Sequence, residues 1–447
     1  MKGKIGYQIF VDRFNNFNNK NNNFLDWDTP IKAHEKQEYD FYGGNLLGIT
    51  KKINYLKKLN IDFLYLTPIF KANTNHRYDT VDFEKIDEII GSEEDLNNLF
   101  LELKINNIDL FLDIALNHTS KYSVLKNNVD FYTGKNWADV NNLPELNIDN
   151  EELKNYFFKF ENSILKKFLK KGISNWRLDC AYDLGYSFLN ELKSELNKTC
   201  DNKLIGEVWS YPKKWLSILD GIMNYYYFDL IKNVLSGNIS GKLFTKIVIE
   251  TFEECGYSLF NCWNMLSSHD TPRILTEFKN KYKLAVILQF ALPGSPLIYY
   301  GEEIGLNGDN DPYCRETMKW EKVNEDNEFL NFYKVLIDEY KNSSALNSGD
   351  ISECYYSDKE IIAFERKSEK IRENRIIIIN PTNEEKEIII YTKNSSLMNN
   401  SKIIDCLTGL EFSVFNSSIK ALIPPLFGGI FKIKEEKEKY NFYKRID

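Results

Sequence analysis

Short apolar segments alternate with longer amphipathic segments over the first three quarters of the chain, and this alternation constrains the fold more than any other feature. Eight strands alternating with helices over about 300 residues are typical of a (β/α)8 barrel, which usually needs about 250. We therefore predict an α/β fold built on a closed TIM barrel. The eight expected strands are Ile5–Val11, Phe63–Ile69, Leu110–Leu116, Trp176–Cys180, Leu204–Trp209, Ile222–Phe228, Phe260–Ser267 and Leu297–Gly301.

Two of the helices between these strands have clear start signals. Ser92 and Asp95 have the spacing of a capping box, and apolar residues follow at helical spacing. The segment from Asp149 to Gly172 is the clearest helix of the chain, because Asp149 can cap its first turn and Gly172 can adopt the left-handed conformation that ends it.

The pattern changes at two places, which divides the chain into domains. A long excursion follows the third expected strand, and after about Ser343 short β-rich segments are separated by polar turns. We predict the barrel at residues 1–117 and 150–343 and a small inserted domain at 118–149. A C-terminal antiparallel β-sandwich is expected at 344–435, followed by a charged tail at 436–447.

Composition excludes several classes of partner. The net charge of −8 argues against nucleic-acid binding, which needs a concentrated basic surface. The longest apolar stretch, Leu284 to Tyr300, contains two prolines and a glycine, so no membrane span is expected. Seven cysteines without a C-x-x-C pair indicate free thiols in a reducing compartment. With no apolar leader after Met1, we predict a cytoplasmic protein and leave its oligomeric state open.

Charged residues at the ends of the expected strands indicate where the site lies. Alternation along the fourth strand places Arg177 and Asp179 on one face, which can point into the barrel. Glu207 and Asp270 end the fifth and seventh strands, so three carboxyl groups meet at one rim. Ordinary surface salt bridges would not produce this clustering. We expect Arg177 to hold Asp179 ionised and the neighbouring negative charges to keep Glu207 protonated.

Histidines support the same location. Three of the four in the chain, His76, His118 and His269, lie just beyond strand ends, each near an aspartate. A single histidine at such a place is more often structural, but three at equivalent places favour a functional interpretation.

Four segments, in order, resemble the signature motifs of the α-amylase superfamily, glycoside hydrolase family 13. They are Asp113–His118, Trp176–Asp179, Gly206–Trp209 and Ser268–Thr271. Further segments resemble the neopullulanase, cyclomaltodextrinase and maltogenic amylase branch: Tyr7–Phe14, Phe41–Gly44, Leu66–Phe70, Asn75–Thr80, Leu143–Asn147 and Pro293–Trp320, with Asp405–Gly409 and Ile423–Pro425 in the C-terminal part.

The resemblance implies a role for each candidate residue. Asp179 would be the nucleophile and Glu207 the acid and base, about 5–5.5 Å apart as in retaining enzymes. Asp270 and His269 would bind sugar hydroxyls and stabilise the distorted ring. The other implied contacts to an α-glucan oligosaccharide are Arg177 orienting Asp179, His118 holding the same glucose, Tyr78 as an aromatic platform, and Asp311 with Arg315 on the next sugar outward.

Three departures from that branch affect specificity. Close relatives carry an extra N-terminal β-domain, for which this chain, starting at its first strand, shows no counterpart. Tyr182-Asp183 follows the nucleophile where Asn-Glu or Lys-His is expected, on the acceptor side. The loop that binds calcium in relatives offers only amides here. We therefore expect no cofactor, with room only for weak calcium binding at Asn16, Asn18, Asn22 and Asn45.

The leading functional prediction is a retaining hydrolase of α-1,4-glucosidic bonds in maltodextrins, extending to cyclic ones, with some transglycosylation. The alternative is a 4-α-glucanotransferase that uses the same intermediate. A catalytically inactive sugar-binding relative is disfavoured because all three carboxyl residues are present.

Overall fold

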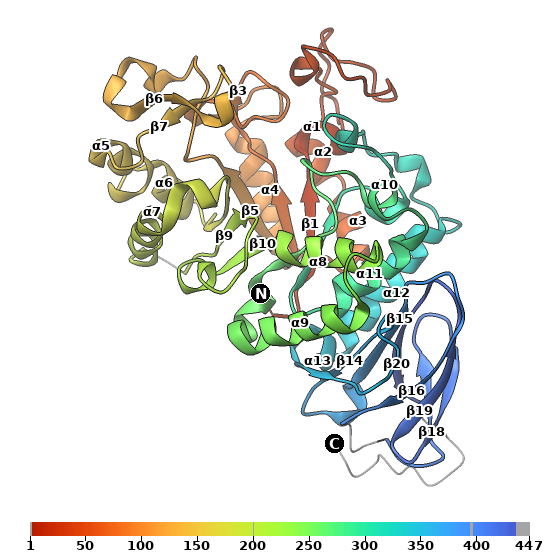
Figure 1. Cartoon of the computed structure of the whole chain (residues 1–447). Helices are drawn as coiled ribbons and strands as arrows, with labels where there is room; N and C mark the ends of the chain where they lie inside the picture. The colour runs from red at the N-terminus through yellow and green to blue at the C-terminus, as the bar shows by residue number, and fades with distance from the viewer. Residues whose placement is uncertain (1, 200, 394–396, 435–447) are drawn as a thin grey trace.

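The computed structural model describes residues 2–199, 201–393 and 397–434, and its centre is a closed barrel of eight parallel strands (Figure 1). The hydrogen-bonded order is β1-β12-β11-β10-β9-β8-β5-β2, so strands that follow one another along the chain are neighbours in the barrel. Each of the eight predicted segments overlaps one of these strands, which confirms the predicted fold class. The barrel strands are β1 (Gly6–Ile9), β2 (Phe63–Leu66), β5 (Asp109–Ile114), β8 (Asn175–Leu178), β9 (Leu204–Val208), β10 (Gly221–Asn224), β11 (Trp263–Asn264) and β12 (Ser295–Tyr299).

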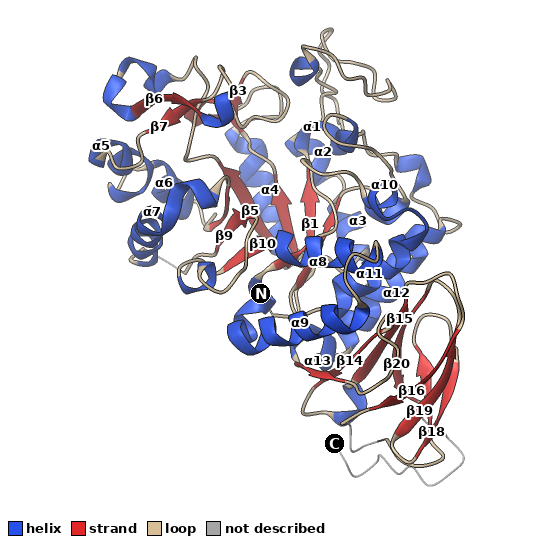
Figure 2. Cartoon of the chain, viewed as in Figure 1, coloured by secondary structure: helices blue, strands red, loops and turns tan. Residues whose placement is uncertain are grey.

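Helices surround the barrel (Figure 2). The predicted capping box is confirmed: the Ser92 side chain accepts from the backbone of Asp95, and the Asp95 side chain accepts from the backbone of Ser92. The helices are α1 (Val11–Phe14), α2 (Leu46–Thr50), α3 (Ile53–Lys58), α4 (Glu93–Ile105), α5 (Glu151–Lys154), α6 (Ile164–Lys170), α7 (Ala181–Asn197), α8 (Tyr225–Leu235), α9 (Gly241–Cys255), α10 (Ile274–Phe278), α11 (Tyr282–Ala291), α12 (Glu328–Asn342) and α13 (Ser344–Ser348).

The prediction of one continuous helix from Asp149 to Gly172 is wrong. Asn150 caps α5, a π-helical turn follows, and extended backbone at Phe160 separates it from α6. The π-helical turn allows two consecutive residues, Phe157 and Phe158, to be buried at the same time against Phe83 and Phe188. Packing therefore overrides the helical pattern here.

Two predicted strands are also too long. The segment Ile222–Phe228 changes from strand to helix after Asn224, because the Asn224 side chain accepts from the backbone N–H of Tyr227 and begins α8. In the segment Phe260–Ser267 only Trp263–Asn264 is a strand.

Two hairpins project from the chain between barrel strands. The first, β3 (Phe70–Ala72) and β4 (Thr80–Ile86), follows β2 and carries Tyr78 in its connection. The second, β6 (Tyr132–Asn136) and β7 (Pro144–Leu146), lies within the segment between β5 and β8. A bridge between His118 and Glu145 attaches the second hairpin to the end of β5.

The C-terminal strands form an antiparallel sheet beside the barrel (Figure 1). Alternate residues of β15 face two different cores: Ile377 and Ile379 pack with the barrel helices, whereas Ile376 and Ile378 line a second core. Residues of β16 and β19, at the opposite end of the strand order, line the same second core, so the sheet has two layers. The strands are β13 (Asp350–Glu353), β14 (Ile362–Lys367), β15 (Arg375–Asn380), β16 (Lys386–Tyr391), β17 (Lys402–Asp405), β18 (Glu411–Phe415), β19 (Ser418–Ile423) and β20 (Phe427–Ile433).

The charged tail predicted at 436–447 lies outside the described residues. Within the described part of the chain, no helix combines the length and the apolar character needed to cross a bilayer.

Candidate active site

Arg177, which is fully buried, is the centre of the charged cluster at the barrel rim. Its Nη1 donates to both carboxylate oxygens of Asp113 at 2.9 Å and to Oδ1 of Asp179 at 2.7 Å. Its Nη2 forms an ion pair with Oε2 of Glu207 at 2.9 Å. One guanidinium therefore holds three carboxylates, which lie on β5, directly after β8 and on β9.

The nucleophile candidate and the acid candidate are positioned by the turn that follows β8. Cys180 adopts a left-handed conformation (φ 47°, ψ 41°) directly before α7, and its backbone N–H donates to Oε2 of Glu207 at 3.1 Å. The Cys180 thiol donates to Oδ2 of Asp179 at 3.1 Å. The Trp209 indole N–H donates to Oε1 of Glu207 at 3.2 Å. Hydrogen bonds from Cys180 and Trp209 thus orient the carboxylates of Asp179 and Glu207.

The predicted electrostatics of Asp179 is wrong in direction. Burial raises the pKa of Asp179 well above its ordinary value, and the opposing charge of Arg177 does not cancel this because Glu207 and Asp113 raise the pKa further. Strand alternation predicted the Arg177 ion pair, but it did not weigh desolvation against it.

His269, Tyr78 and Asp270 form a second hydrogen-bonded group at the barrel rim. The side-chain amide nitrogen of Gln8 lies 2.9 Å from Nδ1 of His269. The other ring nitrogen, Nε2, lies 2.7 Å from the Tyr78 hydroxyl and 2.8 Å from Oδ2 of Asp270. The Tyr78 ring stacks on His269 at 5.3 Å, and its hydroxyl donates to Asp113 at 2.7 Å. This links the group to the Arg177 cluster.

Arg315 connects two of the candidate residues, Asp311 and Asp270. Its Nη1 pairs with Asp311 at 2.9 Å, and its Nη2 lies 3.4 Å from Oδ1 of Asp270. Although burial opposes it, the charges of His269 and Arg315 lower the pKa of Asp270, so this carboxylate is ionised at neutral pH. Asp270 and Asp179 thus have opposite pKa directions within one rim.

His118 is buried (1% exposed) and stacks on Trp137 at 4.9 Å. Neither of its ring nitrogens has a hydrogen-bond partner among the residues that the structure describes. Burial lowers the pKa of His118 to about 4, so the ring is neutral at pH 7 and one nitrogen has a free lone pair. A bound ligand would satisfy it.

A cavity of about 450 Å³ opens beside Glu207. Aromatic side chains of Trp137, Tyr182 and Trp209 line it, and Tyr182 and Trp209 are more than half exposed. The Trp137 indole N–H donates to Asp183 at 2.9 Å, which ties the segment between β5 and β8 to the start of α7. Tyr182 and Asp183, the departures seen in the sequence, therefore lie at this cavity.

The loop expected to bind calcium weakly is held by amide hydrogen bonds. The side-chain oxygen of Asn45 caps α2, and that of Asn16 accepts from the backbone of Asn19. The Asn19 amide donates to the carbonyls of Gly43 and Ile89. Asn18 has a positive φ of 57°, and Asn22 is exposed. The oxygens of Asn16 and Asn45 are already engaged in these contacts.

The structure brings all nine candidate residues to one rim and adds residues that the sequence reasoning left out. Asp113 could have been found, since the parallel register pairs it directly with Arg177. Gln8 could also have been found, because it lies on β1 within the segment Tyr7–Phe14, which resembles the family. Trp137 could not have been found, because nothing in its sequence neighbourhood indicates that it reaches α7.

A closed parallel barrel with clustered carboxylates at the C-terminal ends of its strands is the arrangement of a barrel glycosidase. A family model described as the alpha-amylase catalytic domain matches residues 8–131 and 124–343. The chain belongs to the α-amylase family and is an α-amylase-family glycosidase.

Its relatives lie in the branch that the motifs indicated. Neopullulanase 2 of Thermoactinomyces vulgaris is 30% identical over 96% of this chain and 77% of its own length. The intracellular maltogenic amylase of Bacillus subtilis (strain 168) is 32% identical over 82% of this chain, which spans 66% of that protein. Among solved structures, cyclic alpha-maltosyl-(1-->6)-maltose hydrolase from Arthrobacter globiformis, in complex with the sugar of that name, has a TM-score of 0.78 at 26% identity, covering 96% of this chain and 98% of that chain.

Proposed function

We propose that this protein is a retaining hydrolase of α-1,4-glucosidic bonds in malto-oligosaccharides, with some transglycosylation. The observation that carries the proposal is the Arg177 cluster, which holds Asp179 and Glu207 on two nitrogens of one guanidinium. Two carboxyl groups at a short, fixed separation are what double displacement requires. The expected separation of about 5–5.5 Å stays a prediction.

The reaction follows from these positions. Glu207 donates its proton to the glycosidic oxygen while Asp179 attacks the anomeric carbon, so the C–O bond breaks and a glucosyl–Asp179 ester forms. Glu207, now a carboxylate, accepts a proton from water, whose oxygen displaces Asp179. Asp270, ionised beside His269 and Arg315, holds sugar hydroxyls and stabilises the positive charge that develops on the ring.

The stacked Tyr78 and the unpartnered His118 nitrogens suit the same glucose from two sides. Relatives named for pullulan, maltose release and a cyclic maltosyl sugar support an α-glucan substrate, and cyclic α-glucans are included in the proposal.

A product time course on maltohexaose, β-cyclodextrin and pullulan, run in parallel, tests the proposal. New reducing ends from maltohexaose, released first in the α-configuration, are expected by proton NMR. Products released first as β-anomers would refute the retaining mechanism, and no cleavage of any of the three would refute the function.

The cavity beside Glu207 favours one second candidate, a 4-α-glucanotransferase. Exposed aromatic rings next to the acid/base residue can bind an acceptor sugar in competition with water. Incubation with maltotriose separates the two: longer products without net new reducing ends would replace the hydrolase by the transferase.

We place the protein in the cytoplasm, with an α-glucan as its partner. All six cysteines of the described residues are free thiols, which suits a reducing compartment, and one relative is named as intracellular. Fractionation of the source cells, with activity found outside them, would overturn this placement.

A further inference from the structure

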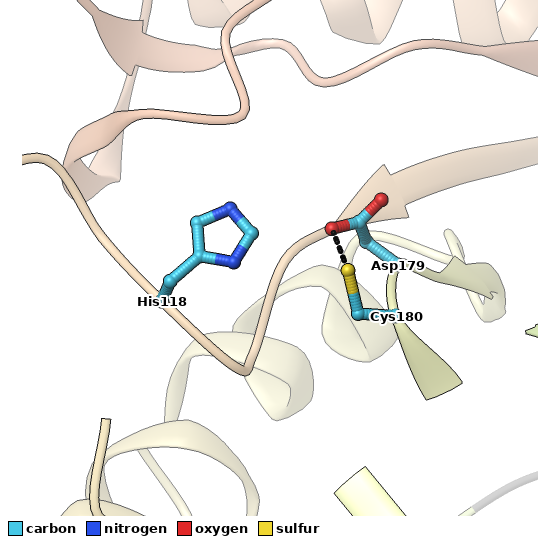
Figure 3. A group of neighbouring side chains, drawn as sticks. All are labelled: His118, Asp179 and Cys180. Atoms are coloured by element: carbon cyan, nitrogen blue, oxygen red, sulfur yellow. Dashed lines mark hydrogen bonds between the residues drawn. The ribbon is translucent and has the colours of Figure 1, made fainter. Parts of the chain in front are cut away.

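The nucleophile of the proposed reaction has a thiol neighbour that the reaction does not use. Cys180 is half-buried, and its sulfur lies 3.1 Å from Oδ2 of Asp179. Arg177 donates to the other oxygen of Asp179, Oδ1, and the thiol donates to Oδ2. His118 faces both groups from the end of β5, as Figure 3 shows.

One ligand atom from each of His118, Asp179 and Cys180 lies within 4.8 Å of the others. The imidazole is the independent observation, because it is 1% exposed and neither nitrogen has a partner in the described part of the chain. Donor atoms around a tetrahedral zinc ion are about 3.3–3.8 Å apart, given bonds of about 2.0–2.3 Å. A movement of about 1 Å by the His118 ring would bring the three donor atoms to the spacing of zinc ligands.

We propose that these three side chains form an inhibitory site for Zn²⁺ within the glucose-binding position of the enzyme. The inference rests on the proposed function in that the ion and the sugar would compete for His118 and Asp179. Binding releases the thiol proton of Cys180 to solvent, and the thiolate, the imidazole and the carboxylate become ligands, with water in the fourth position.

The ligand types select the ion. A nitrogen and a sulfur ligand favour zinc over calcium and magnesium, which prefer oxygen alone.

The test uses the full chain, freed of metal by dialysis, without sugar present. Equilibrium dialysis against ZnCl2 should give one ion per chain at this site, and CoCl2 should produce a thiolate-to-cobalt charge-transfer band. Cys180→Ser keeps the size and the hydrogen bond to Asp179 but removes the sulfur. It should weaken metal binding more than tenfold and abolish the cobalt band, and Cys180→Ala should do the same. Cys255→Ser, which changes another half-buried cysteine at the C-terminal end of α9, is the matched control and should bind as the parent does.

Inhibition supplies the second readout, each variant being normalised to its own rate in a chelator. Zinc should raise the apparent KM for maltohexaose and leave kcat unchanged, and Cys180→Ser should need more than tenfold more zinc for the same effect. Equal binding by the parent and Cys180→Ser, or no cobalt band, would overturn the site. Hydrolysis without metal binding would remove this inference alone, whereas metal binding without hydrolysis would leave the site standing and remove the proposed function.

Discussion

Glu302, in the turn that follows β12, should make the stability of this protein depend on pH. Its side chain is 1% exposed, accepts from the backbone N–H of Tyr299 and contacts the hydroxyl of Ser267. Burial raises the pKa of Glu302 from 4.5 to about 8. The unfolded chain ionises this group freely above pH 4.5, whereas the folded chain keeps it protonated up to about pH 8. Stability is therefore lost as pH rises through this window and levels off above it.

The magnitude follows from the same two values. Each pKa unit corresponds to about 1.36 kcal/mol, so the cost reached between pH 5 and pH 8 is about 3.5 kcal/mol. An entropy of unfolding of about 0.9 kcal/mol/K for a chain of this length converts this to about 4 °C. Glu302→Gln removes the titration and keeps both contacts, because its amide can donate to Ser267 and its oxygen can accept from Tyr299.

Melting temperatures of the parent and Glu302→Gln, measured by calorimetry at pH 5 and pH 8, test this. The variant should gain about 4 °C relative to the parent over that range. Other titrating groups are common to both proteins and cancel. Glu102→Gln, on the exposed face of α4, is the control and should show no such gain. A constant difference between parent and Glu302→Gln at both pH values would refute the reasoning.

Four further measurements probe the site and the loop around Asn45. Asp179→Asn should lower kcat at least about 10³-fold with the melting temperature retained, and unchanged turnover would remove Asp179 as nucleophile. Because burial raises the pKa of Asp179, which must be ionised to attack, the acid limb of kcat/KM should lie above the ordinary aspartate value of about 3.9, and a limb at or below it would show that Arg177 dominates. Trp137→Phe removes the hydrogen bond to Asp183 and should change the ratio of transfer to hydrolysis on maltotriose by several-fold, while a ratio equal to the parent's would exclude the cavity as acceptor site. Treatment with EGTA should leave the melting temperature within about 1 °C, because amide contacts already hold the loop around Asn45, and a larger drop would restore a calcium site.

Much of the fold could be predicted because the barrel depends on a repeated pattern. A period of two along each strand fixes which residues point inward, and Arg177 therefore meets Asp113 across the parallel register. The rim location of Glu207 and Asp270 follows from the same geometry, since the C-terminal ends of all eight strands lie together.

The failures have a common physical origin in packing that is not local in sequence. The break after Lys159 depends on Phe83 and Phe188, which lie far away along the chain. Trp137 reaches Asp183 only because the connection between β6 and β7 contacts the first turn of α7. No periodicity within either segment contains this information.

Asp179 shows why a charge pattern alone does not determine protonation. The sequence places a guanidinium beside the carboxyl group, and that contact exists at 2.7 Å. The same guanidinium, however, also pairs with Asp113 and Glu207, so its charge is shared among three carboxyl groups. At Asp179, desolvation then exceeds the attraction that this shared charge supplies. Asp270 has the opposite balance, since His269 and Arg315 both face it and its side chain keeps 35% of its exposure. The pKa values of Asp179 and Asp270 therefore shift in opposite directions because different numbers of carboxyl groups share the cations beside them. That number is set by how the strands of the barrel rim come together.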